Sequence, residues 1–160
     1  NEEPIIDKSK VARLRNKEFA CRFYEDRYAR GYMDEWPVAK KKRIFEIMRG
    51  LDLPSRGQAL DFGCGNGVFT EVLRQALPPG WSVFGLDFSA QAVEHAKKRY
   101  PLCRFYLPGS REFAGEKFDF IFTHHVLEHV YDLEAALSEI CLLARDRAAV
   151  LHVLPCGNSG

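Results

Sequence analysis

The chain has 160 residues, of which 46% are hydrophobic and 28% are charged, close to the average of a soluble globular domain. This length and composition fit one domain of ordinary size and disfavour a long disordered tail, a collagen-like repeat and a coiled coil. The 23 basic residues nearly balance the 22 acidic ones, so the net charge does not favour nucleic acid or a membrane surface as a partner. No stretch approaches the ~20 apolar residues of a membrane span.

Five cysteines are spread along the chain without paired spacing: Cys21, Cys64, Cys103, Cys141 and Cys156. The odd count, and the lack of an apolar leader after the first residues, are typical of reduced thiols, so we expect a cytoplasmic protein. No C-x-x-C pair occurs, which disfavours a cysteine-rich zinc site.

Residues 1–53 are predicted to form a helical lid or cap segment. Ser9 can cap a first helix, and Pro37 suits the first turn of a second helix that ends near Gly50. The apolar face of the second helix is formed by Ile44, Phe45, Ile47, Met48 and Leu51. A group of aromatic residues before it is a candidate lid over a ligand: Tyr24, Tyr28, Tyr32 and Trp36. The basic run over residues 40–43 is expected to be a solvated helix face rather than a phosphate-binding patch.

From residue 54 onward, short apolar runs alternate with helical patterns. Strands are predicted over residues 58–62, 81–86, 102–107, 118–123 and 148–154. Helices are predicted over residues 68–77, from Ser89 to near Pro101, and from Asp132 onward. This alternation predicts an α/β domain over residues 54–160, with right-handed crossovers and a Rossmann-like, doubly wound, mostly parallel sheet. Ligands of such sheets bind beyond the carboxyl ends of the strands.

A glycine loop follows the first of these strands, in the sequence Asp-Phe-Gly-Cys-Gly-Asn-Gly over residues 61–67. Twenty residues after Gly67, Asp87 ends the second strand, where a carboxylate can accept hydrogen bonds from a ribose diol. The loop departs from the dinucleotide fingerprint, because its third glycine comes one residue early. Asp61 would repel a pyrophosphate and suits a cationic ligand. Loop and acid together therefore predict a nucleoside-type cofactor.

Residues 59–67 (ALDFGCGNG) resemble the first motif of the class I S-adenosylmethionine-dependent methyltransferases. Residues 85–89 (GLDFS) resemble their second motif. Residues 118–122 (FDFIF) and 125–130 (HVLEHV) are similar to the fourth-strand region of the small-molecule branch, including ubiquinone-type O-methyltransferases. The resemblance implies S-adenosyl-L-methionine as the cofactor. It also implies a sheet of seven strands, of which five are visible here, so we expect the C-terminal strands to be missing from this sequence.

The resemblance also implies a set of cofactor-binding residues: Asp61, Gly63, Cys64, Gly65, Asp87, Phe88, Ser110 and His124. The glycine loop would line the methionine part, with Asp61 beneath it. Asp87 would bind the ribose hydroxyls, and Phe88 would pack on the adenine. Ser110 would flank the adenine edge, at a place where relatives often carry an acid. His124, at the tip of the fourth predicted strand, would face the methionine and the methyl acceptor.

A cluster of titratable residues follows the fourth predicted strand, and three interpretations of it are open. His125, Glu128 and His129 have the spacing of an inverzincin zinc site, but the setting in a nucleotide-binding sheet disfavours a peptidase. A divalent metal site, suggested by the resemblance, would use the same three residues and His152. In the favoured interpretation no metal is bound, Glu128 and His129 brace the loop, and His124 or His125 is the catalytic general base.

The sequence therefore predicts a methyltransferase that acts on a small-molecule substrate. No Asn/Asp-Pro-Pro-Tyr motif follows the fourth predicted strand, which favours a hydroxyl acceptor over an amide or amine. Three alternatives remain open. They are an RNA methyltransferase that uses the basic run, a scaffold subunit that binds the cofactor without turnover, and a reductase.

Overall fold

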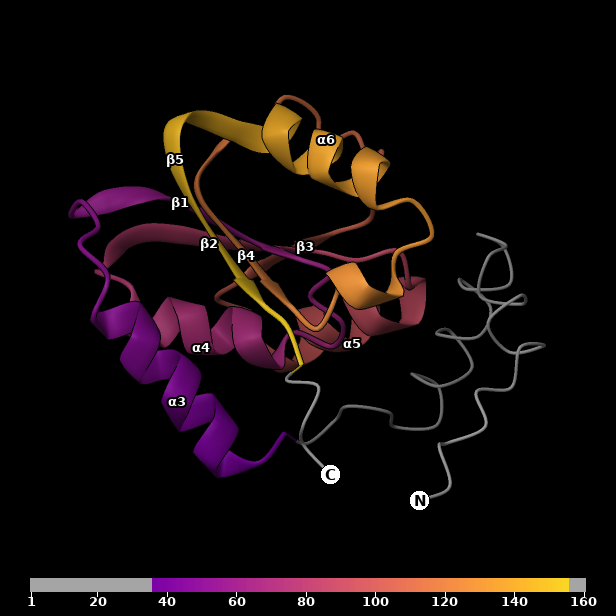
Figure 1. Ribbon diagram of the computed structural model, residues 1–160. Coiled ribbons are helices and arrows are strands. Elements are labelled where there is room, and N and C mark those ends of the chain that lie inside the picture. Colours follow the sequence, from indigo (N-terminus) through magenta and orange to yellow (C-terminus); the bar gives the residue numbers. More distant parts are fainter. Residues whose placement is uncertain (1–35, 156–160) are drawn as a thin grey trace, which may run out of the picture.

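A computed structural model of the chain describes residues 36–155 (Figure 1). The helix predicted from Ser9 and the aromatic residues Tyr24, Tyr28 and Tyr32 lie outside these residues. Every helix within the described part is too short or too polar to cross a lipid bilayer.

A five-stranded parallel sheet forms the centre of the domain and confirms the predicted Rossmann-like fold. Its strands are β1 (Arg56–Phe62), β2 (Gly80–Leu86), β3 (Arg104–Tyr106), β4 (Phe118–His124) and β5 (Ala144–Val153). They lie in the order β3-β2-β1-β4-β5, and every neighbouring pair is parallel. The strand order reverses between β1 and β4, which places the crevice expected for a ligand at the carboxyl ends of these two strands.

Helices cover both faces of the sheet. Figure 1 shows α3 (Val38–Arg49), α4 (Val68–Ala76) and α5 (Ala90–Arg99) on one side, and α6 (Leu133–Leu143) on the other. A short 3-10 helix, η1 (Leu127–His129), follows β4. As predicted, Ser89 and Asp132 cap α5 and α6: Ser89 Oγ accepts from Ala92 N at 3.1 Å, and Asp132 Oδ1 accepts from Ala135 N at 2.9 Å.

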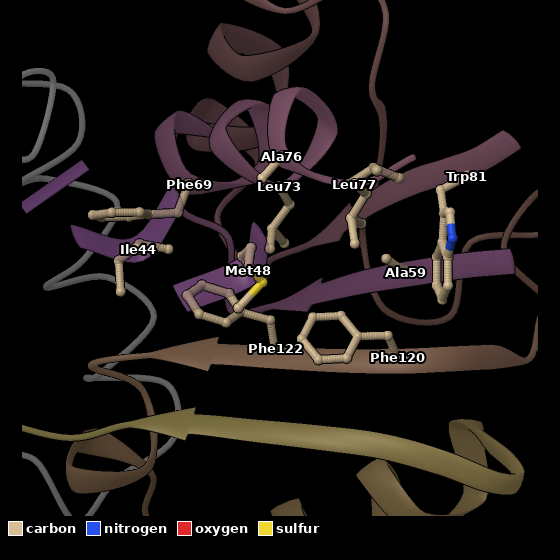
Figure 2. Close-up of a cluster of buried hydrophobic side chains, with 11 residues drawn as sticks. Ile44, Met48, Ala59, Phe69, Leu73, Ala76, Leu77, Trp81, Phe120 and Phe122 are labelled. Carbon is tan, nitrogen blue, oxygen red and sulfur yellow. The ribbon is translucent and has the colours of Figure 1, made fainter. Parts of the chain in front are cut away.

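The second predicted helix, α3, packs into the same hydrophobic core as α4 and β4. Ile44 and Met48 of α3 are buried against Phe69 of α4 and Phe122 of β4 (Figure 2). Burying each of these side chains contributes about 1.5–3 kcal/mol. The packing holds the start of α3, including the residue before its proline, Trp36, close to the end of β4.

Candidate functional site

A cavity of about 340 Å³ opens at the carboxyl ends of β1, β2 and β4, where the fold predicts ligand binding. Cavities of this size are typical of small-molecule and cofactor sites. Most of the predicted site residues line it: Asp61, Gly63, Cys64, Gly65, Asp87, Phe88, His124 and His125. The structure thus brings together predicted residues from the ends of three separate strands.

The glycine loop forms the floor of this cavity and requires glycine for two reasons. Gly63, Gly65 and Gly67 have φ values of +77°, +55° and +88°, a region that glycine adopts without strain. Space is also limited, because a Cβ at Gly63 would come within 2.6 Å of the Val126 side chain. The backbone N–H groups of Gly63 and Cys64 donate to the carbonyl of Leu86 at 2.8 and 3.0 Å. The loop is therefore held against the end of β2.

Asp87 adds a further hydrogen bond between the end of β2 and the glycine loop. Its Oδ2 accepts from Gly65 N at 2.8 Å, and its Oδ1 accepts from Ser89 N at 2.9 Å. The carboxylate also lines the cavity. Phe88 lines the cavity and is 51% exposed, and an aromatic ring in such a place can pack on a flat ligand group.

Asp61 is almost completely buried, with 2% of its surface exposed. Burial raises the pKa of its carboxyl to about 7, against the lowering effect of Thr70, whose hydroxyl donates to Asp61 Oδ2 at 2.8 Å. The Asp87 charge raises this pKa further. A buried carboxylate with only partial compensation favours a cation beside it.

His124 is 7% exposed and packs within an aromatic cluster. Its ring centroid lies 4.1 Å from that of Phe69 and 4.9 Å from that of Trp36. Burial, and then the neighbouring His125 and Lys40, lower the pKa of His124 to about 3, so the ring is neutral at physiological pH. Within residues 36–155, its Nε2 has no hydrogen-bond partner.

His125 follows β4 in a left-handed backbone conformation, with φ +54°. Its backbone N–H donates to the carbonyl of Val153 at 2.9 Å, which fixes the residue to the end of β5. Its Nε2 lies 3.2 Å from Lys40 Nζ, and its Nδ1 lies 3.6 Å from Glu128 Oε1. Burial, and then Lys40, lower the pKa of His125, although Glu128 opposes this. The imidazole is therefore neutral at physiological pH.

Lys40 contacts two residues of the cavity lining, although the sequence places it in a basic run that is expected to be a solvated helix face. Its Nζ lies 4.4 Å from the centroid of the Trp36 ring as well as beside His125. Burial lowers the pKa of Lys40, while the Glu128 charge raises it. Lys42 does fit a solvated face, because its exposed side chain pairs with Glu46 at 4.0 Å. The helical period could have indicated this. Lys40 precedes the buried Ile44 by four residues and therefore lies on the same face of the helix.

The predicted set of site residues differs from the residues that line the cavity. Ser110 is not among the residues that line the cavity, and within residues 36–155 its buried hydroxyl has no partner. Trp36, expected in a lid, lines the cavity. The sequence interpretation assigned no role to several further lining residues: Asn66, Phe69, Val126, Tyr131 and Glu139. Asn66 stands between two loop glycines, and that position alone could have indicated a site residue.

In the metal interpretation, His152 could add an imidazole to the residues after β4. His152 Nδ1 instead lies 2.7 Å from the Thr123 hydroxyl oxygen. In the described part of the chain, no group of three or more His, Cys, Asp or Glu side chains is arranged to hold a metal ion.

Comparison with known proteins identifies the same family as the motifs. The family described as "Methyltransferase domain" matches residues 27–159. The chain is 35% identical over 111 residues to a demethylmenaquinone methyltransferase of Roseiflexus sp., covering 61% of this chain and 42% of that protein. It is 29% identical over 113 residues to a trans-aconitate 2-methyltransferase of Variovorax paradoxus, covering 69% and 42%.

Solved structures agree on the fold. The plantazolicin methyltransferase BpumL, solved with a desmethyl plantazolicin analogue and S-adenosylhomocysteine, matches with a TM-score of 0.60 at 16% identity, over 91% of this chain and 61% of that one. The chain covers between 33% and 48% of the length of the first three curated relatives. The motifs, the strand order and the family match agree: the chain belongs to the class I S-adenosylmethionine-dependent methyltransferases.

Proposed function

We propose that this chain is the cofactor-binding part of an enzyme that transfers a methyl group from S-adenosylmethionine to a hydroxyl group of a small molecule. The observation that carries the proposal is one cavity that combines a glycine loop, the carboxylates of Asp61 and Asp87, and the neutral His125. The first two features suit a cationic nucleoside, and the third suits an acceptor that must lose a proton.

The residues in the cavity fit the cofactor. The buried Asp61 carboxylate would gain a cation beside it, and the Asp87 carboxylate, which lines the cavity at the end of β2, would accept from the ribose diol. Gly63, Cys64 and Gly65 would line the methionine part. The half-exposed Phe88 ring would pack on the adenine.

His124 and Ser110 differ in how well they fit a contact with the cofactor. His124 Nε2 has no hydrogen-bond partner within residues 36–155, and with the ring proton on Nδ1 it would accept from an ammonium group of the cofactor. Ser110 was predicted at the adenine edge. Because it lies outside the cavity lining, we assign it no contact in this proposal.

When bound, the cofactor supplies a methyl group attached to a sulfonium sulfur. Transfer of that group needs in-line orientation of the acceptor and a pocket that excludes water. The aromatic rings of Trp36, Phe69 and His124 provide an apolar wall. We assign the general base to His125 rather than to His124. A ring with a pKa of about 3 is too weak a base to hold a proton near neutral pH.

The relatives support a small-molecule acceptor, since they include a demethylmenaquinone methyltransferase and a trans-aconitate 2-methyltransferase. No specific observation favours RNA. In the basic run, Lys40 contacts His125 and Lys42 pairs with Glu46, which gives these two charges partners within the chain.

Calorimetric titration of the protein with S-adenosylmethionine, with S-adenosylhomocysteine and with NADH tests the cofactor. We expect the first two to bind and NADH not to bind. A folded sample that bound NADH alone would make the protein a reductase. Mass spectrometry of a panel of hydroxylated metabolites then tests turnover. Binding without any methylated product would instead indicate a scaffold subunit.

A further inference from the structure

We propose that Lys40 and His125 act as a pair that selects a hydroxyl acceptor, whose oxygen inserts between Lys40 Nζ and His125 Nε2. This inference rests on the proposed function and names the chemical group that the site accepts. Lys40 belongs to none of the expected site motifs. Its assignment depends on the packing of α3 against the end of β4.

The protonation pattern of the pair follows from its donors. A lysine ammonium only donates hydrogen bonds, so at 3.2 Å His125 Nε2 must be the acceptor. The ring proton then lies on Nδ1, which faces Glu128 Oε1 at 3.6 Å. One neutral tautomer thus places an acceptor nitrogen towards the Lys40 ammonium and an N–H group towards the Glu128 carboxylate.

The surroundings leave Lys40 incompletely paired. Within residues 36–155, the ammonium contacts a neutral imidazole and the face of Trp36, and it has no carboxylate within ion-pair distance. Lys40 itself does not line the cavity, but Trp36 and His125 both do. A ligand oxygen that reaches these two residues would therefore meet an ammonium with hydrogen-bonding capacity to spare.

Counting lone pairs distinguishes the possible acceptors. A hydroxyl oxygen has two lone pairs and one proton. It can accept from Lys40, donate to His125 Nε2 and still direct one lone pair at the methyl group. An amine nitrogen has one lone pair, which it would lose to Lys40. A carboxylate has no proton to give to His125.

The transfer balances in atoms and charge. The acceptor O–H bond breaks and its proton passes to His125 Nε2, while the oxygen bonds to the methyl carbon and the sulfonium sulfur keeps the electron pair of the broken S–C bond. The imidazolium that forms has its Nδ1–H facing the Glu128 carboxylate, which stabilises it. Lys40 would stabilise the negative charge that develops on the oxygen.

The backbone at position 125 provides an independent reason to expect a positioned side chain. His125 is one of two non-glycine residues in the described part with a positive φ. Histidine tolerates this region better than most residues, but the conformation still has a cost and often occurs at functional sites. The hydrogen bond to Val153 holds the residue in this conformation.

The test compares Lys40→Met with Lys42→Met, a matched change on the exposed face of the same helix, and with Lys40→Arg, which keeps a donor. The first readout is the ¹⁵N spectrum of the His125 ring without any ligand. We expect Lys40→Met to move the Nε2 resonance and Lys42→Met to leave it unchanged. An unchanged resonance in Lys40→Met would overturn the pairing.

The second readout adds phenol, aniline or benzoate to the complex with S-adenosylhomocysteine. We expect phenol to shift the His125 Nε2 resonance in the unmodified protein and to shift it much less in Lys40→Met, with partial recovery in Lys40→Arg. Absence of a phenol shift, or equal shifts from all three probes, would overturn the selection. Loss of one charge-assisted hydrogen bond should also reduce methyl transfer by about 10- to 100-fold.

The two proposals fail in different ways. If S-adenosylhomocysteine does not bind to the folded, unmodified protein, the proposed function fails. The ligand-free spectrum would still report whether Lys40 sets the tautomer of His125. If S-adenosylhomocysteine binds but the resonance ignores Lys40, the pair proposal alone fails.

Discussion

Asp87 at the end of β2 accepts a hydrogen bond of 2.8 Å from the backbone N–H of Gly65 in the glycine loop. The residue expected to hold the cofactor therefore also holds the loop on which the cofactor would lie. Its loss should affect binding through both contacts.

Replacing Asp87 by alanine should weaken the binding of S-adenosylhomocysteine by about 10- to 100-fold, because hydrogen bonds to a charged group contribute ~1.5–3 kcal/mol. Asp87→Asn should lose less, since an amide oxygen can still accept from Gly65. Glu94→Ala, at an exposed position on α5, is the control. Isothermal titration provides the measurement, and an unchanged Kd in Asp87→Ala would refute the ribose assignment.

Asp61 should make cofactor binding depend on pH. Its raised pKa of about 7 means that the folded protein retains a proton that the unfolded chain has lost between about pH 4 and about pH 7. In the ligand-free protein this group therefore reduces the stability of the fold as the pH rises through that range. A bound cation favours the ionised form. Affinity for S-adenosylmethionine should therefore rise about 10-fold from about pH 6 to about pH 8.

Two variants test the source of this pH dependence. Asp61→Asn should bind more weakly and with no such slope. Thr70→Val removes a hydrogen bond that lowers the pKa of Asp61, so the rise in affinity should move to higher pH. A slope that persists in Asp61→Asn would assign the effect to another group.

His124 should remain neutral in a ¹⁵N NMR titration from about pH 8 down to about pH 4.5, because burial lowers its pKa to about 3. Its lowered pKa also means that the unfolded chain takes up a proton that the folded protein does not. This group therefore reduces stability as the pH falls through the ordinary histidine range. His124→Phe identifies the resonance by its loss. A midpoint near neutrality would return His124 to the list of candidate bases.

Trp36 should report cofactor binding by fluorescence. The chain contains two tryptophans, and Trp36 lines the cavity whereas the indole N–H of the buried Trp81 donates to the carbonyl of Pro54. Addition of S-adenosylhomocysteine should change the emission of the unmodified protein and of Trp81→Phe. The change should vanish in Trp36→Phe. A response that followed Trp81 would place the ligand away from this cavity.

The fold was predictable because each of its elements has a local signal. Ser89 and Asp132 are strong caps, and the glycine loop lies between a strand and a helix, as its motif requires. The boundaries were less predictable. β3 is three residues long although the apolar run over residues 102–107 suggested more, and β5 begins at Ala144, before the apolar run over residues 148–154.

A site residue was predictable only where its type and its position at a strand end were enough to indicate a contact with a ligand. Asp61 and Asp87 are recognisable from the strand ends that carry them. Lys40 was not, because its role depends on the packing of α3 beside β4, a contact between residues 85 positions apart. Contacts with distant residues also give the adjacent His124 and His125 different environments. His124 is enclosed by aromatic rings, whereas His125 lies between the Lys40 ammonium and the Glu128 carboxylate.

The left-handed backbone at His125 has a practical consequence. Glycine adopts this conformation at no steric cost, so His125→Gly should remove the imidazole while keeping the turn between β4 and η1. The space it leaves, beside Lys40 and Glu128, has the shape and the hydrogen-bonding groups for a free imidazole. Chemical rescue by added imidazole could then separate the chemistry of the ring from the structure of the chain that carries it.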